Sequence, residues 1–338
     1  MNNGSRGQPV CATNGRRRLL LAAGLASLVA PRRAAAQPAP YRIGFLGNST
    51  AALEANLIEP FRQGLRDLGY VEGRNLVIEW RWAEGNYDRF PKLVAELAAQ
   101  NVAVIVTAGT PAALAVEKEA PAIPLVMAAV GDPVGTGLAK SLAMPGGNAT
   151  GLTAIAPELE GKRLELLKEI VPDLERVSFL LNPSNPLNVG SERQARAAAR
   201  ELRIDVHSAA VRTAADFDRA FAEIRAQRPG ALIMLADRVF LHNRDRIVAF
   251  AEQYRLPTVY AYRELVDAGG LMSFGPNYAE MHRRAAYYVD RILKGAKPRE
   301  LPIEVPTKFE LIINLKRAMS LGLEIPEAVL LRADEIVR

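Results

Sequence analysis

The residues of this sequence best suited to chemistry are short polar side chains that directly follow apolar runs. Asn48, Ser49 and Thr50 follow the run that ends at Gly47, and Asn182 follows the run 177–181. Such hydroxyl and amide groups, with a few carboxylates and rings, suit the capture of a neutral or zwitterionic small molecule. The candidate ligand-binding residues are Asn48, Ser49, Thr50, Gly109, Thr110, Asp132, Asn182, Ser184, Asn185, Asp237, Tyr262, Glu264, Ser273, Phe274 and Tyr278.

Each candidate also has a purely local interpretation. Ser, Thr, Asn and Asp at these points could cap the helices that follow, because their side chains satisfy the free N–H groups at a helix N-terminus. Asp132 and Asp237 share this ambiguity, and Tyr278 could equally cover the core. The sequence leaves ligand binding and capping open for each of them.

The sequence offers little for catalysis. Its three histidines, His207, His242 and His282, show no spacing typical of metal ligands. The stretch 271–275 has leucine where a nucleophile elbow requires glycine, and there is no P-loop. Carboxylates among the candidates could in principle form an acid–base pair, but no feature selects two of them. We therefore expect no catalytic residues, no cofactor and no metal site.

The candidates require a scaffold that brings strand ends together, and the first half of the chain predicts one. Short β-branched runs alternate with helical patterns, which indicates parallel βαβ units. Ligands bind beyond the carboxyl ends of such strands. The predicted strands are 41–47, 76–82, 102–107, 123–128 and 148–153, with helices at 52–68, 89–99 and 110–118.

The second half repeats this alternation. The segment IGFLGNST is echoed by VSFLLNPSNP, and IPLVMAAVGDPVGTGL by LPTVYAYRELVDAGGL. A repeat of this length is far longer than the unit of a solenoid and indicates two similar α/β lobes, each a doubly wound parallel sheet. Here the predicted strands are 177–182, 204–209, 231–235, 258–261 and 271–274, with helices at 158–171, 190–202, 216–226, 244–254 and 278–293.

The N-terminus has the pattern of a secretory signal. Arg16–Arg18 precede an apolar run of 12 residues, 19–30, and small residues up to Ala36 precede Gln37. The run is too short to span a bilayer, and the arginines also fit the twin-arginine pattern. We expect residues 1–36 to be removed near Ala36–Gln37 and the protein to reach the periplasm. Cys11, the single cysteine, lies upstream of the run, so we expect no lipid anchor.

The formal net charge of +6 belongs to this leader. Residues 1–36 hold six arginines and no acidic residue, and the remaining chain has 37 basic and 37 acidic residues. A balanced chain gives no electrostatic reason to expect nucleic acid or an anionic membrane as partner. About 300 residues without a cysteine can bury a sizeable core, and that length favours two lobes over one.

Several long motifs resemble a known family. They are YRIGFLG, FRQGLRDLGYVEGRNLVIEWRWAEGNYDRFPKLVAELA, VIVTAGTPAALA, VGDPVGTGLAKSLAMPGGNATGLT and LGLEIPEAVLLRADEIV. Together they are similar to the periplasmic substrate-binding components of ABC transporters, in the group that contains tryptophan- and phenylalanine-binding members. The resemblance covers nearly all of residues 40–338.

The resemblance implies a type I periplasmic-binding-protein fold with three crossings between the lobes. It places lobe 1 at 40–151 plus 276–304 and lobe 2 at 152–275 plus 305–338, with a hinge near 151–152, 274–275 and 302–306. By motif position, Asp132, Asp237 and the stretch SFGPNY match pocket segments of amino-acid-binding members. The chain departs from those members at NPSNP, where a longer loop with Ser and Gln is usual. The ligand therefore stays open.

The resemblance also implies the partners. We expect a monomer that binds a small polar or aromatic molecule and meets an ABC permease and its ATPase at the inner membrane. Alternatives are a ligand-sensing binding protein for a receptor kinase and an α/β enzyme, for which no nucleophile–base pair is evident. A transcriptional repressor would require a helix-turn-helix where the export signal stands.

Overall fold

The computed structural model describes residues 39–154 and 159–338. The predicted export signal and Cys11 lie outside the described residues. Within the described part, no helix is both long and apolar enough to cross a membrane.

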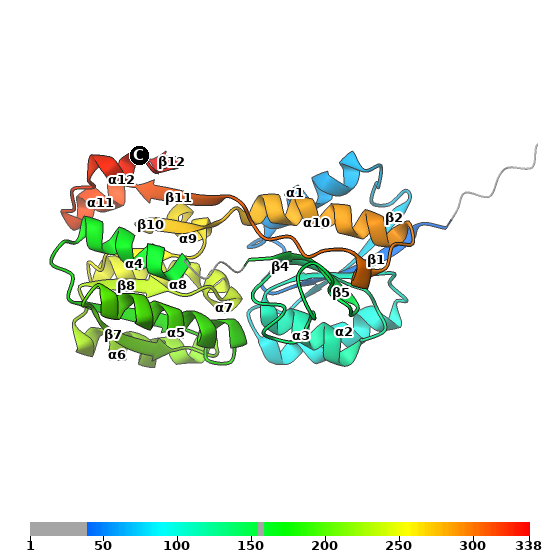
Figure 1. Cartoon of the computed structure of the whole chain (residues 1–338), viewed down its shortest axis with the longest axis horizontal. Helices are drawn as coiled ribbons and strands as arrows, with labels where there is room; N and C mark the ends of the chain where they lie inside the picture. Colours follow the sequence, from blue (N-terminus) through cyan, green and yellow to red (C-terminus); the bar gives the residue numbers. More distant parts are fainter. Residues whose placement is uncertain (1–38, 155–158) are drawn as a thin grey trace, which may run out of the picture. The chain divides into compact units, whose positions relative to one another are not determined.

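The first sheet has five parallel strands in the order β2-β1-β3-β4-β5. Strands β1, β3, β4 and β5 are wholly or largely buried, as expected of a sheet covered by helices on both faces, whereas the edge strand β2 is only partly buried. Helices α2 and α3 cover one face, and α1 and α10 cover the other (Figure 1). The elements are β1 Tyr41–Gly47, α1 Ala55–Asp67, β2 Leu76–Trp82, α2 Phe90–Ala99, β3 Ile105–Ala108, α3 Thr110–Glu119, β4 Leu125–Val130 and β5 Ala149–Thr153.

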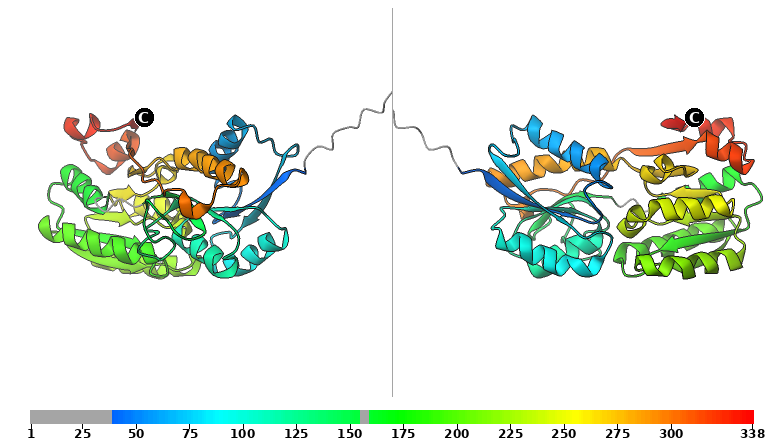
Figure 2. Two further views of the ribbon diagram at one scale, coloured as in Figure 1. Left: turned by 45° about the vertical axis from the view of Figure 1, so that its right-hand side comes forward. Right: turned by 180° about the vertical axis from the view of Figure 1, so that it is seen from behind.

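The second sheet has seven strands in the order β12-β11-β10-β9-β8-β6-β7. All its neighbouring pairs are parallel except β10 with β11. Figure 2 shows its helices from behind. The elements are α4 Leu159–Ile170, β6 Arg176–Leu181, α5 Pro186–Glu201, β7 Asp205–Ala210, α6 Phe217–Gln227, β8 Ala231–Met234, α7 Arg238–His242, α8 Arg244–Gln253, β9 Thr258–Tyr260, α9 Arg263–Asp267 and β10 Met272–Pro276.

After β10 the chain returns to the first sheet. Helix α10, Tyr278–Leu293, packs closely against α1 and β4. The contact requires a glycine on α1, because a Cβ on Gly64 would lie 2.5 Å from the carbonyl oxygen of Arg283. We call β1–β5 with α1–α3 and α10 the first lobe.

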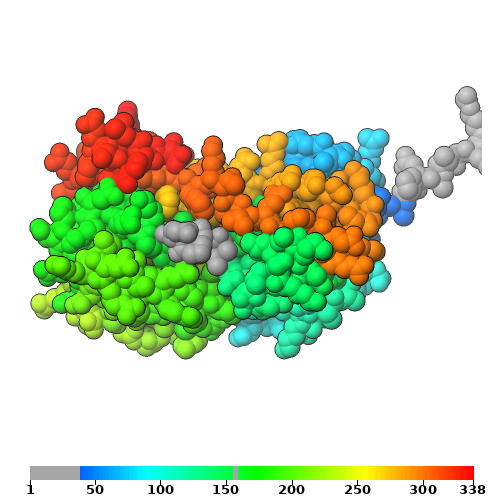
Figure 3. All heavy atoms as spheres, viewed as in Figure 1, coloured from blue at the N-terminus to red at the C-terminus, as the bar shows by residue number. Residues whose placement is uncertain are grey.

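The chain then crosses back for its last elements. These are β11 Phe309–Asn314, α11 Leu315–Leu321, α12 Glu327–Leu330 and β12 Glu335–Val337. In Figure 3 the C-terminal segment (red) lies against the green part of the chain, to which α4 belongs. Arg332 pairs with Glu169 of α4. We call β6–β12 with α4–α9, α11 and α12 the second lobe.

The predicted fold class, α/β with two parallel-sheet lobes, is confirmed by these sheets. Strand β2 and helix α10 have the predicted bounds. Strands β11 and β12 were not predicted, and β11 makes the second sheet mixed because it runs antiparallel to β10. The five-residue helices α7 and α9 were not predicted either, because they are too short to show a helical period.

Candidate functional site

Polar side chains from both lobes meet where the strands of the two sheets end. Among the described residues, three hydrogen bonds between two side chains join the lobes directly, so this structure has the lobes in contact. They link Ser49 Oγ with His242 Nδ1 (2.6 Å), Asn56 Nδ2 with Glu264 Oε1 (2.6 Å), and Tyr87 OH with Asp237 Oδ1 (2.8 Å). We call this region the junction.

Asp237 lies at the centre of the second-lobe side of the junction. It is buried and caps α7 by accepting a hydrogen bond from Val239 N at 2.9 Å. Its oxygens also accept from Asn185 Nδ2 (2.8 Å), Asn182 Nδ2 (3.3 Å) and Tyr87 OH (2.8 Å). Burial raises the pKa of Asp237, and these hydrogen bonds oppose that rise. The carboxylate therefore holds three loops together through the protein's own donors.

Glu54 organises the first-lobe side. Its Oε1 accepts from the backbone N–H groups of Asn48 (2.9 Å) and Ser49 (2.6 Å), which folds the loop after β1 around it. Burial raises its pKa, and the charge of Arg238 opposes this. Asn48 Nδ2 donates to Ala108 O at 2.8 Å, whereas Asn48 Oδ1 is buried without a partner among the described residues. The loop thus offers one unused acceptor.

Arg238 is the cation of the junction. Its side chain is 3% exposed, and its guanidinium carbon lies 5.2 Å from the ring centroid of Tyr262 and 5.1 Å from that of Tyr278. Burial raises the pKa of both tyrosines, so the rings stay neutral. Within the described chain, its guanidinium has no hydrogen bond and no ion pair, although Glu54 and Glu264 lie within electrostatic reach. The guanidinium N–H groups are unused donors.

Two further acceptors near Arg238 are unused. Glu264 accepts from Asn56 through Oε1, and its Oε2 is buried without a partner in the described residues. His282 Nδ1 lies 2.7 Å from Tyr278 O; because a carbonyl only accepts, this nitrogen carries the proton. Burial, helped by the charge of Arg238, lowers the pKa of His282 to about 3. Its Nε2 is therefore a neutral acceptor, and it too has no partner there.

A cavity of about 230 Å³ adjoins the junction and is lined from both lobes. The first lobe contributes Asp132, and the second contributes Arg163; the ring of Tyr278 also lines it. Arg163 is fastened by the protein itself: Nη1 donates to Glu160 Oε1 at 2.7 Å, and Nε donates to Phe274 O at 2.9 Å. We call this space the larger cavity, to distinguish it from the smaller one described next.

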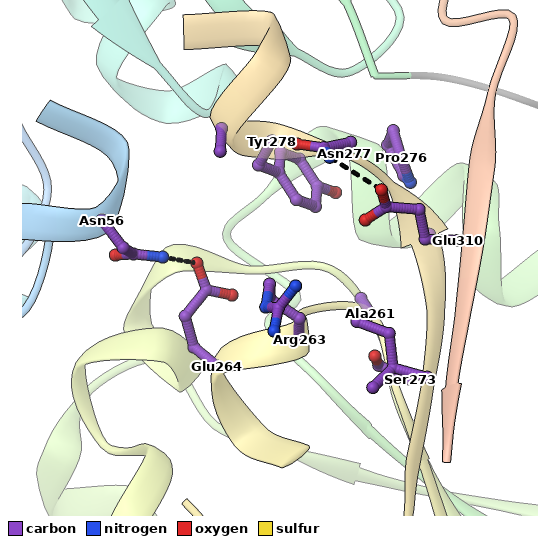
Figure 4. Close-up of a pocket in the computed structure, with 12 residues that line it drawn as sticks. Asn56, Ala261, Arg263, Glu264, Ser273, Pro276, Asn277, Tyr278 and Glu310 are labelled. Atoms are coloured by element: carbon purple, nitrogen blue, oxygen red, sulfur yellow. Dashed lines mark hydrogen bonds between the residues drawn. The ribbon is translucent and has the colours of Figure 1, made fainter. Parts of the chain in front are cut away.

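A second cavity of about 20 Å³ lies beside α9 and the start of α10, close to one water in size. Figure 4 shows Asn56 and Glu264 pointing toward one another there, and Asn277 Nδ2 donating to Glu310 Oε1 at 2.7 Å. Ser273 also lines it. Of these two cavities, only the larger approaches the size of an amino acid.

The structure places the sequence candidates in three settings. Asn48, Ser49, Gly109, Asn182, Asn185, Asp237, Tyr262, Glu264 and Tyr278 meet at the junction. Asp132 lines the larger cavity, and Ser273 lines the smaller one. Thr50 accepts from Leu53 N, Thr110 donates to Gly131 O, Ser184 is exposed, and Phe274 uses its carbonyl oxygen to accept from Arg163.

A side chain that caps a helix can make a second interaction here. Asn185 caps α5 and Asp237 caps α7, yet the same side chains bond across loops. Which candidates contact a ligand stays a prediction.

Six residues of the junction were not among the sequence candidates: Glu54, Asn56, Tyr87, Arg238, His242 and His282. Arg238 had a detectable signal, because it is a charged residue directly after an apolar strand and beside a candidate. Glu54 and His282 lie on helical patterns, where a polar residue is ordinary.

Comparison with known proteins gives the family. A profile described as ABC transporter substrate binding protein matches residues 52–337. A tyrosine-binding protein of Clostridioides difficile (strain R20291) is 25% identical over 257 residues, which is 75% of this chain and 73% of that protein.

Two solved structures are similar over 88% of this chain. A conserved domain protein from Vibrio cholerae O1 biovar eltor is 31% identical, with a TM-score of 0.82 over 99% of its length. An ABC domain from Streptococcus pneumoniae in complex with L-Trp is 25% identical, with a TM-score of 0.82 over its full length. With the family profile matched over this much of its sequence, the chain belongs to the ABC transporter substrate-binding proteins, which bind and do not catalyse.

Proposed function

We propose that this protein binds an aromatic L-amino acid between its lobes and delivers it to an ABC permease and its ATPase at the inner membrane. One observation carries the choice of ligand: two relatives that are each 25% identical to this chain name L-Trp and tyrosine. These ligands share an α-amino acid group and an aromatic ring.

The larger cavity supports this ligand class. An aromatic amino acid needs room for its ring beside the groups that bind its charged end. Tyr278 brings a ring to the wall of the cavity, and Leu159 and Leu187 bring apolar surface. Because the two lobes share the lining, opening them would expose the ligand.

The hinge is the second part of the proposal. We assign residues 40–151 plus 276–304 to one rigid lobe and 152–275 plus 305–338 to the other, with motion at the crossings. In support, Leu152 pairs with Glu304 in an isolated bridge, so two crossing segments lie side by side. Arg284 pairs with Glu304 at 2.7 Å and ties the third crossing to α10.

Location is proposed from the sequence. Residues 1–36 direct the chain to the periplasm and are cleaved near Gln37, leaving a monomer without lipid. A substrate-binding protein of an ABC system meets its permease in that compartment.

Thermal unfolding with a ligand panel tests the function. L-Tryptophan, L-tyrosine and L-phenylalanine are compared with L-leucine, L-glutamate and glucose. At a hundredfold excess over Kd, a true ligand stabilises the folded state by about 2.7 kcal/mol, so the unfolding temperature should rise for at least one aromatic amino acid. A rise with glucose alone, or no rise with any aromatic amino acid at millimolar concentration, would refute the ligand class.

A further inference from the structure

The guanidinium of Arg238 is buried without a hydrogen-bond acceptor from the described residues. A guanidinium has five N–H donors, and burying a charge without hydrogen-bond acceptors is costly. Arg238 is 3% exposed, and no acceptor among the described residues bonds its guanidinium, whose nitrogens keep only a small contact with solvent. The rings of Tyr262 and Tyr278 attract its charge, but rings do not replace oxygen acceptors for five donors.

The neighbouring carboxylates do not fill this role. Glu54 is occupied by the backbone N–H groups of Asn48 and Ser49, and Glu264 is bonded by Asn56. Neither forms an ion pair with Arg238. The junction therefore combines unused donors on a cation with unused acceptors, the latter at Asn48 Oδ1 and Glu264 Oε2.

The unused donors and the unused acceptors together match an amino acid zwitterion, which carries a carboxylate and an ammonium. A carboxylate accepts two parallel hydrogen bonds from a guanidinium, and an ammonium only donates. Arg238 and Asn48 pack on the same glycine: a Cβ on Gly109 would lie 3.2 Å from Arg238 Cγ and 3.3 Å from Asn48 Oδ1. Gly109 has a φ of +83°, so its conformation also disfavours a larger residue.

We propose that Arg238 binds the carboxylate of the ligand and that Glu264 Oε2 and Asn48 Oδ1 accept hydrogen bonds from its ammonium. This inference rests on the proposed amino-acid function and adds the residues that read the zwitterion. These three residues do not line the larger cavity, so the lobes part to admit the zwitterion, and the side chain of the ligand extends past Tyr278, which does line that cavity.

The assignment predicts how selectivity is divided. Removing the ligand's carboxylate charge leaves Arg238 unsatisfied, whereas changing the ring leaves it bonded. The loss of one charged hydrogen bond weakens binding by roughly ten- to a hundredfold. L-Tryptophanamide should therefore bind at least tenfold more weakly than L-tryptophan.

Isothermal titration tests the assignment as a cycle of two ligands and several variants. L-Tryptophan and L-tryptophanamide are titrated into the wild type, Arg238→Met and Arg238→Lys. In Arg238→Met, L-tryptophan should lose at least tenfold in affinity, and the two ligands should bind alike because the group that distinguished them is gone. Arg238→Lys should retain part of the preference, since it keeps the charge but not the planar fork.

Arg246→Met is the matched control. Arg246 also lies over aromatic rings, 5.3 Å from the centroid of Phe217, but it pairs with Asp218 on the surface. Its loss should leave the affinity for L-tryptophan unchanged.

The outcomes separate the two proposals. If the wild type binds no aromatic amino acid, the proposed function fails, and the assignment of Arg238 fails with it. If the wild type binds L-tryptophan and its amide equally, the assignment alone is overturned, and this result needs no variant to fold. Wild-type affinity for L-tryptophan in a folded Arg238→Met protein would overturn it as well.

Discussion

Arg163 and Arg238 occupy similar environments and yet are held in different ways. Both are buried, 1% and 3% exposed, and both lie near Tyr278. Arg163 is bonded by Glu160 and by Phe274 O, whereas Arg238 has only ring contacts in the described structure. Burial alone therefore does not assign a role to an arginine. The hydrogen-bond partners distinguish the two roles, because the fold supplies acceptors to the guanidinium of Arg163, whereas that of Arg238 needs an acceptor from outside the protein.

We expect the largest loss of stability from a substitution of Arg163, the arginine with hydrogen-bond partners. Arg163→Met leaves Glu160 as a buried carboxylate without its counter-charge, and it leaves Phe274 O without a donor. Breaking a buried ion pair in this way costs about 3–5 kcal/mol of unfolding free energy. Urea denaturation of the variant measures it. A loss below about 1 kcal/mol would mean that the pair is not a structural element.

Arg238→Met should cost less in the same assay. Without ligand, the substitution removes a buried charge that lacks hydrogen bonds, but it also removes the attraction to two rings and to the buried carboxylates of Glu54 and Glu264. Because no hydrogen-bonded ion pair is broken, we expect a loss of about 1–2 kcal/mol of unfolding free energy, smaller than that of Arg163→Met. Destabilisation as large as that of Arg163→Met would erase the contrast between the two arginines.

A smaller effect concerns His242, a third basic group, which bonds Ser49 across the lobes. Burial lowers its pKa in this structure, and the nearby charges are Glu84, which raises it, and Arg244, which lowers it. A lowered pKa means that neutral His242 stabilises the arrangement with the lobes in contact. This stabilisation is fully present above the ordinary pKa of about 6.5 and is lost as the pH falls below that value.

Affinity for the ligand should therefore fall modestly between pH 7.5 and pH 5. Titration of ligand into the wild type and into His242→Asn at pH 7.5 and pH 5 isolates His242, because the carboxylates titrate equally in both proteins. The same pH dependence in the variant would show that His242 does not contribute.

Much of the fold was predictable because its signals are local. Runs such as Leu125–Val130 are apolar on both faces, and α10 presents a regular apolar face, so element type follows from the sequence pattern. The edge strand β12 and helix α7 were missed because three- and five-residue elements are fixed by their neighbours. Their positions depend on contacts that no local pattern encodes.

The candidate site was predicted only in outline. The rule that ligands bind at strand ends found Asp237, Glu264 and Tyr278, since those positions follow from topology. It also selected Ser184, which is exposed. It passed over Arg238, because the absence of hydrogen-bond partners depends on the side chains of distant segments.

A crystal structure of the protein with L-tryptophan tests the central claim most directly. The decisive measurement is the distance from the ligand's carboxylate oxygens to the guanidinium nitrogens of Arg238. We predict two contacts of about 2.7–2.9 Å, with the indole ring beside Tyr278 and lined by both lobes. A ligand bound elsewhere, or one bound in the junction with its carboxylate more than about 4 Å from Arg238, would contradict the account, because no direct hydrogen bond spans that distance.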